Sequence, residues 1–150
     1  MKTSELNLQE IAIFEGVDEK YIEEFLASGK LIDLKAGDYL FHQNDIGDTM
    51  YIIQSGKLQI TVSEKNPTNN LPSNKVLGNF ESGVLIGELC VFGQVKRSAS
   101  ISALTDAKLL KFDGEDFRIR IYSKELDALL ICYNIAKVLS QRLYTTDSKL

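Results

Sequence analysis

The sequence predicts a mainly β domain with helices at both ends, and three observations lead to this fold class. Between residues 30 and 112, apolar and polar residues alternate with a period of two in short segments, as they do in half-buried strands. Seven of the ten glycines lie from Gly37 to Gly93, where they divide these segments with turns. Helical spacing of apolar residues occurs before and after this region. Many short strands joined by turns favour an antiparallel sandwich or barrel.

Residues 1–29 are expected to form a helical cap. Leu8, Ile11 and Ala12 fall on one helical face, and Asp18 is a suitable N-cap for a second helix. That second helix has four apolar residues at helical spacing: Tyr21, Ile22, Phe25 and Leu26.

The β region, residues 30–112, shows its alternation most clearly over residues 58–62 and 98–103. Residues 63–75 contain both prolines and almost no apolar side chain. We interpret them as an exposed hairpin loop within the sheet. The last strand is expected over residues 108–112.

Residues 113–150 return to helical patterning. Asp113 can cap a short helix that runs through Phe117, and Ser123 can cap a longer helix that runs to about Tyr144.

The long C-terminal helix is apolar over most of its circumference. Its polar positions Asp127, Asn134 and Gln141 recur every seven residues and form one narrow stripe. One face of a β domain can hardly cover the rest of so wide an apolar surface. We therefore expect a protein partner or a homodimer through this helix.

Composition narrows the classes of function. A length of 150 residues suits one domain, and 17 Lys and Arg against 21 Asp and Glu give a net charge of −4. This balance offers no broad basic surface, so we expect no nucleic-acid binding. The chain has neither the apolar N-terminal run of a signal peptide nor ~18 consecutive apolar residues for a membrane span. We expect a cytoplasmic protein without membrane insertion.

The sequence contains few of the residues that bind metals or carry out thiol chemistry. Cys90 and Cys132 are the only cysteines, and His42 is the only histidine. These are too few for a disulfide framework, a zinc site or a multi-histidine metal centre. We interpret His42 as an ordinary strand residue and both cysteines as packing residues. No catalytic residue, metal ligand or catalytic cofactor is expected.

The segment from residue 83 to residue 100 carries the chemistry. Gly87 allows a ligand to approach the backbone, and a short helix that follows would present the N–H groups of Leu89 and Cys90. Arg97 adds a planar cation suited to phosphate oxygens. Together these groups predict a small anionic ligand.

Glu88 is the exception in a segment otherwise suited to negative charge. Its carboxylate would repel a phosphate but can accept a hydrogen bond from a sugar hydroxyl. The alternative is that Glu88 and Arg97 form a partly buried ion pair that closes a loop. The residues alone leave both interpretations open.

The order Gly87-Glu88-Leu89 and then Arg97-Ser98-Ala99 resembles the phosphate-binding cassette of the cyclic nucleotide-binding domain family. This family includes bacterial catabolite activator proteins, regulatory subunits of protein kinase A and cyclic-nucleotide-gated channels. The resemblance covers nearly the whole chain, since residues 40–48, residues 51–56, Gly83 and the terminal helix also follow the family pattern.

The resemblance implies an eight-stranded antiparallel jelly-roll barrel with N-terminal helices and a long C-terminal helix. It implies a single domain over residues 1–150, with the β jelly roll over residues 30–112 and the cassette over residues 83–100. Gly87 and Glu88 would hold the ribose 2′-hydroxyl. Arg97 would hold the cyclic phosphate together with four neighbours: Leu89, Cys90, Ser98 and Ala99. Three residues of the terminal helix are expected to cover the base: Leu130, Tyr133 and Asn134.

Three residues depart from the commonest family pattern. Val84 replaces an acidic residue, Lys96 replaces a proline, and Cys90 replaces a smaller side chain. Ser98 follows the arginine and is compatible with adenine or guanine. The choice between cAMP and cGMP stays open, with cAMP favoured.

The expected function is a stand-alone, non-enzymatic sensor of cAMP or cGMP that signals by repositioning its C-terminal helix. One alternative is a domain that has lost its ligand and acts as a protein-interaction or dimerisation module. Another is the sensor part of a transcription regulator, in which a helix-turn-helix domain would follow the long helix. Few residues follow Leu143, so DNA binding is not expected.

Overall fold

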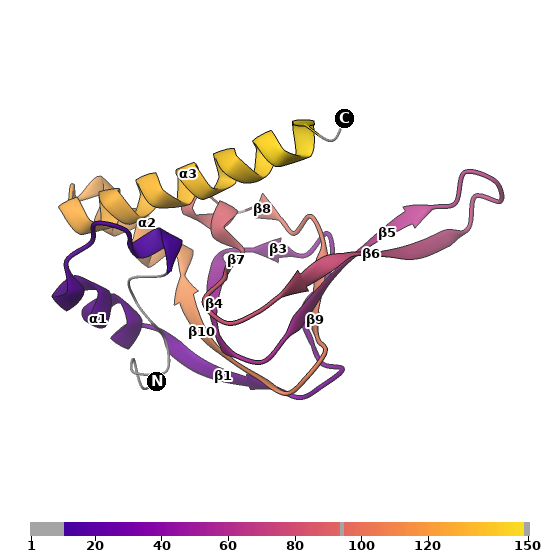
Figure 1. The fold of residues 1–150 in the computed structure, drawn as a ribbon, viewed down its shortest axis with the longest axis horizontal. Coiled ribbons are helices and arrows are strands. Elements are labelled where there is room, and N and C mark those ends of the chain that lie inside the picture. The colour runs from indigo at the N-terminus through magenta and orange to yellow at the C-terminus, as the bar shows by residue number, and fades with distance from the viewer. Residues whose placement is uncertain (1–10, 94, 149–150) are drawn as a thin grey trace.

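Two four-stranded antiparallel sheets form the centre of the structure, a computed structural model that describes residues 11–93 and 95–148 (Figure 1). The first sheet has the strand order β1-β10-β4-β7 and the second has the order β2-β9-β5-β6, while β3 and β8 pair as a short ribbon. The strands are β1 (Lys30–Leu34), β2 (Tyr39–Phe41), β3 (Ile46–Gly47), β4 (Thr49–Ser55), β5 (Leu58–Lys65), β6 (Pro72–Phe80), β7 (Leu85–Ile86), β8 (Val95–Lys96), β9 (Ser100–Ala103) and β10 (Ala107–Asp113). The predicted mainly β fold with flanking helices is confirmed. The predicted eight-stranded jelly-roll barrel is present as a jelly-roll-like pair of four-stranded sheets that do not close into one barrel.

Two apolar cores hold these layers together. One lies between the helices and the first sheet and includes Phe25, Phe112 and Ile131. Within it, the rings of Phe25 and Phe112 stack with their centroids 4.5 Å apart. The other core lies between the two sheets and includes Leu58 and Ile101. The period-two alternation of the sequence places these inward-facing side chains in the second core.

The N-terminal cap consists of the 3₁₀ turn η3 (Ala12–Phe14) and helix α1 (Glu19–Ala27). Asp18 caps α1 as predicted, because its carboxylate accepts a hydrogen bond from the Lys20 N–H at 3.0 Å. The shared helical face predicted for Leu8, Ile11 and Ala12 is not found in the described part of this segment. Ile11 is buried and Ala12 is exposed, because a 3₁₀ turn replaces the α-helical spacing. Leu8 lies outside the described residues.

Helix α2 (Gly114–Tyr122) begins at the predicted cap, since Asp113 accepts hydrogen bonds from the N–H groups of Glu115 and Asp116. It continues past Phe117, the end that the sequence predicts. Ser123 was expected to begin the next helix, but it is the C-cap of α2.

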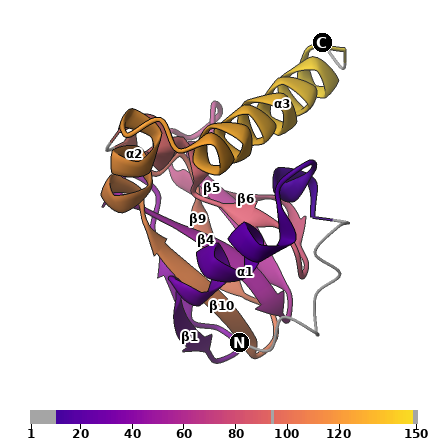
Figure 2. The same ribbon diagram turned by 90° about the vertical axis from the view of Figure 1, so that its left-hand side faces the viewer.

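The long helix α3 (Leu126–Ser148) starts three residues later and lies across the top of the domain (Figure 2). Its polar stripe is not continuous, because Asn134 is 3% exposed while Gln141 is exposed. The Asn134 amide donates to the backbone carbonyls of Ile13 and Glu15 at 2.9 and 2.8 Å. Four apolar side chains of α3 remain more than 60% exposed: Leu126, Tyr133, Leu143 and Tyr144. None of the described helices is both long enough and apolar enough to cross a bilayer.

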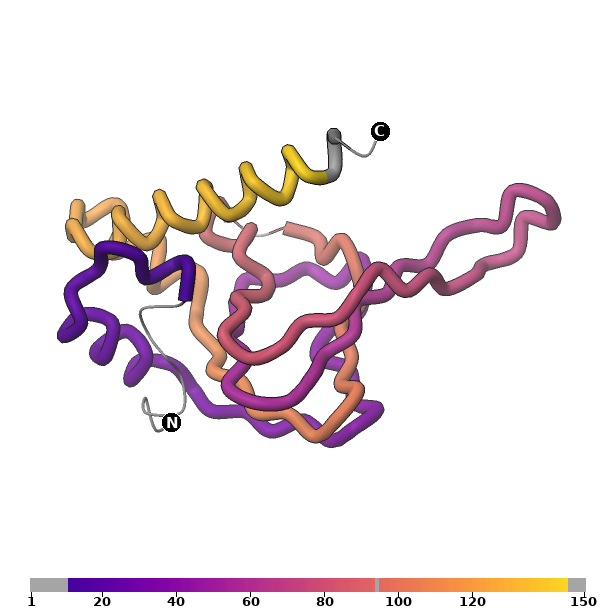
Figure 3. Tube along the Cα trace, viewed as in Figure 1, coloured from indigo at the N-terminus to yellow at the C-terminus, as the bar shows by residue number. Residues whose placement is uncertain are grey.

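Strands β5 and β6 form a long hairpin whose outer half extends away from the rest of the domain (Figure 3). The loop predicted over residues 63–75 is therefore wrong in extent. Pairing continues through Ser63↔Asn74 to Lys65↔Pro72, and the connection is residues 66–71. In the outer half of the hairpin, pairing between the two strands satisfies the backbone hydrogen bonds although neither face is buried. The sequence of this segment therefore shows no alternation of apolar and polar residues. Strand β6 lies at the edge of its sheet, where a proline is tolerated.

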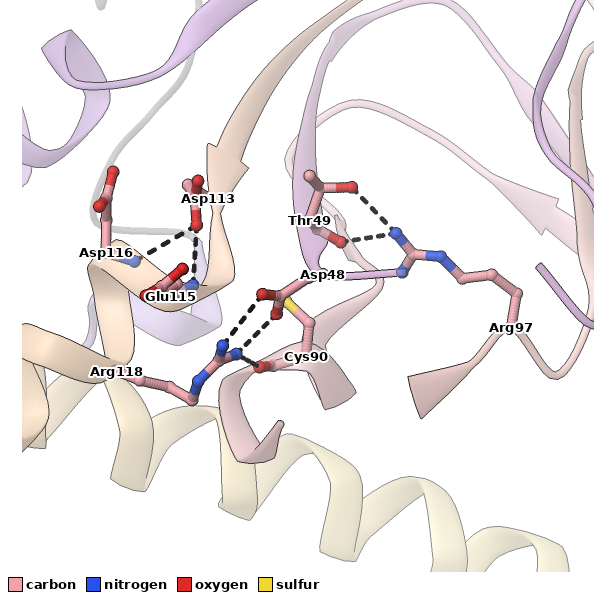
Figure 4. Close-up of polar contacts among 8 residues, drawn as sticks. All are labelled: Asp48, Thr49, Cys90, Arg97, Asp113, Glu115, Asp116 and Arg118. Atoms are coloured by element: carbon pink, nitrogen blue, oxygen red, sulfur yellow. Dashed lines mark hydrogen bonds and ion pairs between the residues drawn. The ribbon is translucent and has the colours of Figure 1, made fainter. Parts of the chain in front are cut away.

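A polar contact fixes helix α2 to the start of strand β4 (Figure 4). The Arg118 guanidinium donates to both carboxylate oxygens of Asp48, at 2.6 and 3.0 Å, and also to the backbone carbonyl of Cys90. The Asp48 carbonyl accepts a hydrogen bond from the Gly114 N–H at 2.9 Å. The hydrogen bond from Arg118 holds the pKa of Asp48 below its ordinary value of 3.8, against the opposing effect of burial.

The lowered pKa makes stability depend on acidity. The Asp48–Arg118 contribution is fully present above the ordinary carboxyl pKa near 3.8 and is lost as the pH falls through the lower folded value. We expect Asp48→Asn to reduce the free energy of unfolding by about 1–2 kcal/mol at pH 7, and to lose less stability than the wild type below pH ~4. Urea unfolding between pH 7 and pH 2 measures both effects. Asp33→Asn, at an exposed position of β1, is the control; equal pH profiles for wild type and Asp48→Asn would contradict the prediction.

Candidate functional site

The cassette begins where strand β7 ends. Gly87 follows with φ of +76° and leads into the 3₁₀ turn η4 (Glu88–Phe92). A Cβ atom at Gly87 would lie 2.6 Å from Nη1 of Arg97 and 2.8 Å from the Thr49 carbonyl oxygen. Both the left-handed backbone and the close approach of Arg97 therefore require glycine at this position.

Arg97 lies inside the domain and is only 6% exposed. Its Nη2 donates to the backbone carbonyl and the hydroxyl of Thr49, both at 2.9 Å (Figure 4). Its guanidinium carbon lies 4.2 Å from the ring centroid of Phe41. Among residues 11–93 and 95–148, no carboxylate lies within 4.0 Å of this guanidinium. Arg97 is thus a buried cation held by neutral groups.

Glu88 does not pair with Arg97, so the loop-closing ion pair that the sequence left open is not formed. The Glu88 carboxylate accepts instead from Nη1 of Arg142, on helix α3, at 2.8 Å. The Glu88 side chain is 14% exposed and that of Arg142 is 43% exposed. This contact joins the cassette to the last third of α3.

A cavity of about 230 Å³ opens beside these residues. It collects six of the seven cassette residues predicted as ligand contacts: Gly87, Glu88, Leu89, Arg97, Ser98 and Ala99. Apolar side chains from both sheets complete the wall, among them Phe41, Ile60 and Phe80 of the second sheet and Ile86 of the first. The cavity therefore offers a cation, a carboxylate and an apolar surface within one small volume.

Cys90 is the cassette residue that lies outside this lining. Its side chain is fully buried, and its N–H donates to the Gly87 carbonyl at 3.2 Å within the turn. That N–H is therefore not directed to a ligand in this arrangement. Burial raises the pKa of the Cys90 thiol to about 11, so the thiol is neutral near pH 7 and behaves as a packing residue.

None of the three residues expected to cover the base lines the cavity in this arrangement. Leu130 packs against the helical core and Tyr133 is 64% exposed. The Asn134 side chain is hydrogen-bonded to the carbonyl of Ile13 in η3 and to that of Glu15, the residue after η3. Arg142 is the residue of α3 that lines the cavity. Sequence reasoning missed it because the crossing of α3 over the sheets decides which turn meets the cassette. A basic residue late in a largely apolar helix was the available signal.

A family model described as the cyclic nucleotide-binding domain matches residues 31–121, more than half of the chain. The chain is 30% identical over 114 residues to the cyclic AMP receptor protein of Thermus thermophilus, which is 76% of this chain and 49% of that protein. It is 29% identical over 112 residues to lysophospholipase nte1 of Neosartorya fischeri, which is 75% of this chain and 7% of that protein. The chain thus spans less than half the length of these curated relatives.

Among solved structures, the catabolite activator protein of Thermus thermophilus superimposes with a TM-score of 0.78 at 25% sequence identity. The alignment covers 92% of this chain and 61% of that one. The likeness therefore extends beyond the cassette to the sheets and the long helix. The family match over residues 31–121, together with the shared fold, shows that the chain belongs to the cyclic nucleotide-binding domain family.

Proposed function

We propose that this domain binds a 3′,5′-cyclic nucleotide in the cavity beside Arg97 and acts as a sensor whose signal is carried by helix α3. The observation that carries the proposal is the burial of Arg97 without a carboxylate partner in the described part of the chain. Removing a guanidinium from water costs several kcal/mol unless an opposite charge compensates it. One carbonyl, one hydroxyl and one aromatic ring in contact, with the Asp48 carboxylate at longer range and already bound by Arg118, compensate only in part. A singly charged cyclic phosphate would complete the balance.

Glu88 suits the ribose. Its side chain lines the same cavity, and its carboxylate forms an ion pair with Arg142, the single ion pair of Glu88 among the described residues. A carboxylate has about four acceptor positions, so Glu88 can accept from a ribose hydroxyl as well. The Gly87 backbone lies beside it without a Cβ in the way.

The base would lie against the apolar wall near Phe80. The guanidinium of Arg142 lies 5.9 Å from the centroid of this ring, so the α3 turn that contains Arg142 borders the same part of the cavity. We therefore propose that this turn covers the base, in place of Leu130, Tyr133 and Asn134, which the sequence had predicted for this role. Ser98 also lines the cavity and offers a hydroxyl. We favour cAMP over cGMP because the Thermus relative is named as a cyclic AMP receptor.

Helix α3 is in a position to respond to the ligand. It contacts the cassette through Arg142–Glu88, while Asn134 anchors its middle to the N-terminal cap. It follows α2 through a corner at which Lys124 has φ of +62°. A ribose hydroxyl that shares the Glu88 carboxylate with Arg142 would alter the contact between these two side chains and so shift the population of α3 positions. We propose that a protein partner or a second copy, bound through the exposed apolar residues of α3, receives this signal without catalysis by the domain.

The ligand assignment is tested by calorimetric titration with cAMP and with cGMP. We expect wild-type binding, with cAMP the tighter ligand, and at least a tenfold loss of affinity in Arg97→Met, because charge-assisted hydrogen bonds worth about 1.5–3 kcal/mol each are removed. Lys111→Met removes an exposed cation on β10 and should leave the affinity unchanged. Absence of heat and of any thermal shift with both nucleotides would contradict the proposal and favour a ligand-free interaction module.

The signalling step has its own test. Amide hydrogen exchange across residues 138–145 should change when cAMP binds the wild type. In Arg142→Gln, cAMP should still bind, but this change should become at least twofold smaller because α3 is uncoupled from Glu88. Lys137→Gln is the matched control, since Lys137 lies on the same helix and pairs with Glu15. An equal response in Arg142→Gln and wild type would show that the Glu88–Arg142 contact does not transmit the signal.

A further inference from the structure

The orientation of the Arg97 guanidinium is fixed from four sides. A Cβ atom at Gly47 would lie 2.1 Å from its Nε, and one at Gly87 would lie 2.6 Å from its Nη1. The Phe41 ring lies beneath it, and Thr49 binds its Nη2. The two glycines and the ring provide space and contact, whereas Thr49 provides directed hydrogen bonds.

Two oxygen atoms of Thr49 accept hydrogen bonds from the same nitrogen of Arg97, Nη2. Its backbone carbonyl and its hydroxyl oxygen each accept from Nη2 at 2.9 Å, so both hydrogens of Nη2 are engaged. The hydroxyl then donates to the Tyr51 hydroxyl oxygen at 3.0 Å. Thr49 and Tyr51 lie two residues apart on β4 and therefore share one face of the strand. Tyr51 is 7% exposed, so its hydroxyl is held within the core.

This arrangement determines which donors remain for a ligand. A guanidinium has five N–H groups, and Nη2 accounts for two of them. In the described part of the chain, no hydrogen bond engages the three that remain on Nε and Nη1. These are the atoms beside Gly47 and Gly87, where the absence of side chains leaves the backbone close to the guanidinium.

We propose that Thr49, oriented by Tyr51, is a positioning residue for anion recognition. It holds Nη2 of Arg97 so that Nε and Nη1 are presented to the phosphate. The inference rests on the proposed function for the ligand, but the hold of Thr49 on Arg97 is a property of the protein alone. Neither residue was predicted from the sequence to contribute to the site, although Tyr51 begins the segment 51–56 that follows the family pattern.

The binding test uses three variants and cAMP. Thr49→Val keeps the shape and the backbone carbonyl but removes the hydroxyl, and we expect about a tenfold loss of affinity. Thr49→Ser restores the hydroxyl and should bind within about twofold of wild type. Tyr51→Phe leaves the Thr49 hydroxyl unoriented and should show an intermediate loss. Unchanged affinity in Thr49→Val, or a loss that serine does not rescue, would overturn the proposal.

The positioning test needs no ligand. In protein labelled with ¹⁵N-arginine, restrained rotation of the Arg97 guanidinium should give resolved Nη–H signals, assigned by their absence in Arg97→Lys. These signals should merge in Thr49→Val and remain resolved in Thr49→Ser. Persistence of resolved signals in Thr49→Val would overturn the inference. If wild type shows the restraint but binds no cyclic nucleotide, the proposed function fails while the role of Thr49 stands. If Thr49→Val does not fold, Tyr51→Phe in both measurements decides the question.

Discussion

The buried guanidinium of Arg97 is the constraint around which this site is built. No carboxylate in the described part of the chain pairs with it directly, so its direct contacts are with neutral groups, and the Asp48 carboxylate acts on it only at longer range. Its position explains why Gly47 and Gly87 lack side chains, since a Cβ at either one would overlap the guanidinium. It also explains the placement of Phe41 and Thr49 against it. A net charge of −4 for the chain is compatible with such a site, because one local cation is sufficient for one phosphate.

The cassette turn η4 is connected to two helices at different points. Arg118 of α2 binds the Cys90 carbonyl near the middle of the turn, and Arg142 of α3 binds the Glu88 carboxylate at its start. Arg118 also binds Asp48, which immediately precedes the residue that holds Arg97. Under the proposed function, a ligand that displaced η4 would therefore act on α2 and α3 together. The Asn134 side chain separately anchors the middle of α3 to the N-terminal cap.

Much of the fold followed from local chemistry in the sequence. Asp18 and Asp113 were identified as helix caps because a short carboxylate next to a helical pattern has few other local uses, and both cap their helices. The cassette residues were predicted because the order Gly87-Glu88-Leu89 and Arg97-Ser98-Ala99 resembles the phosphate-binding cassette of the family; the residues alone also allowed an ion pair between Glu88 and Arg97. Features set by packing were missed. The burial of Asn134 and the approach of Arg142 depend on the crossing of α3 over the domain, which periodicity does not determine.

The central claim is that the phosphate of a cyclic nucleotide binds Arg97 while Thr49 keeps its hold on the same side chain. A crystal structure of the protein with cAMP tests this most directly. The phosphate oxygens should lie within hydrogen-bond distance of Nε or Nη1 of Arg97, with Nη2 still on Thr49 and the ribose 2′-hydroxyl on Glu88. A nucleotide bound elsewhere, or a phosphate in the cavity without contact to Arg97, would contradict the claim.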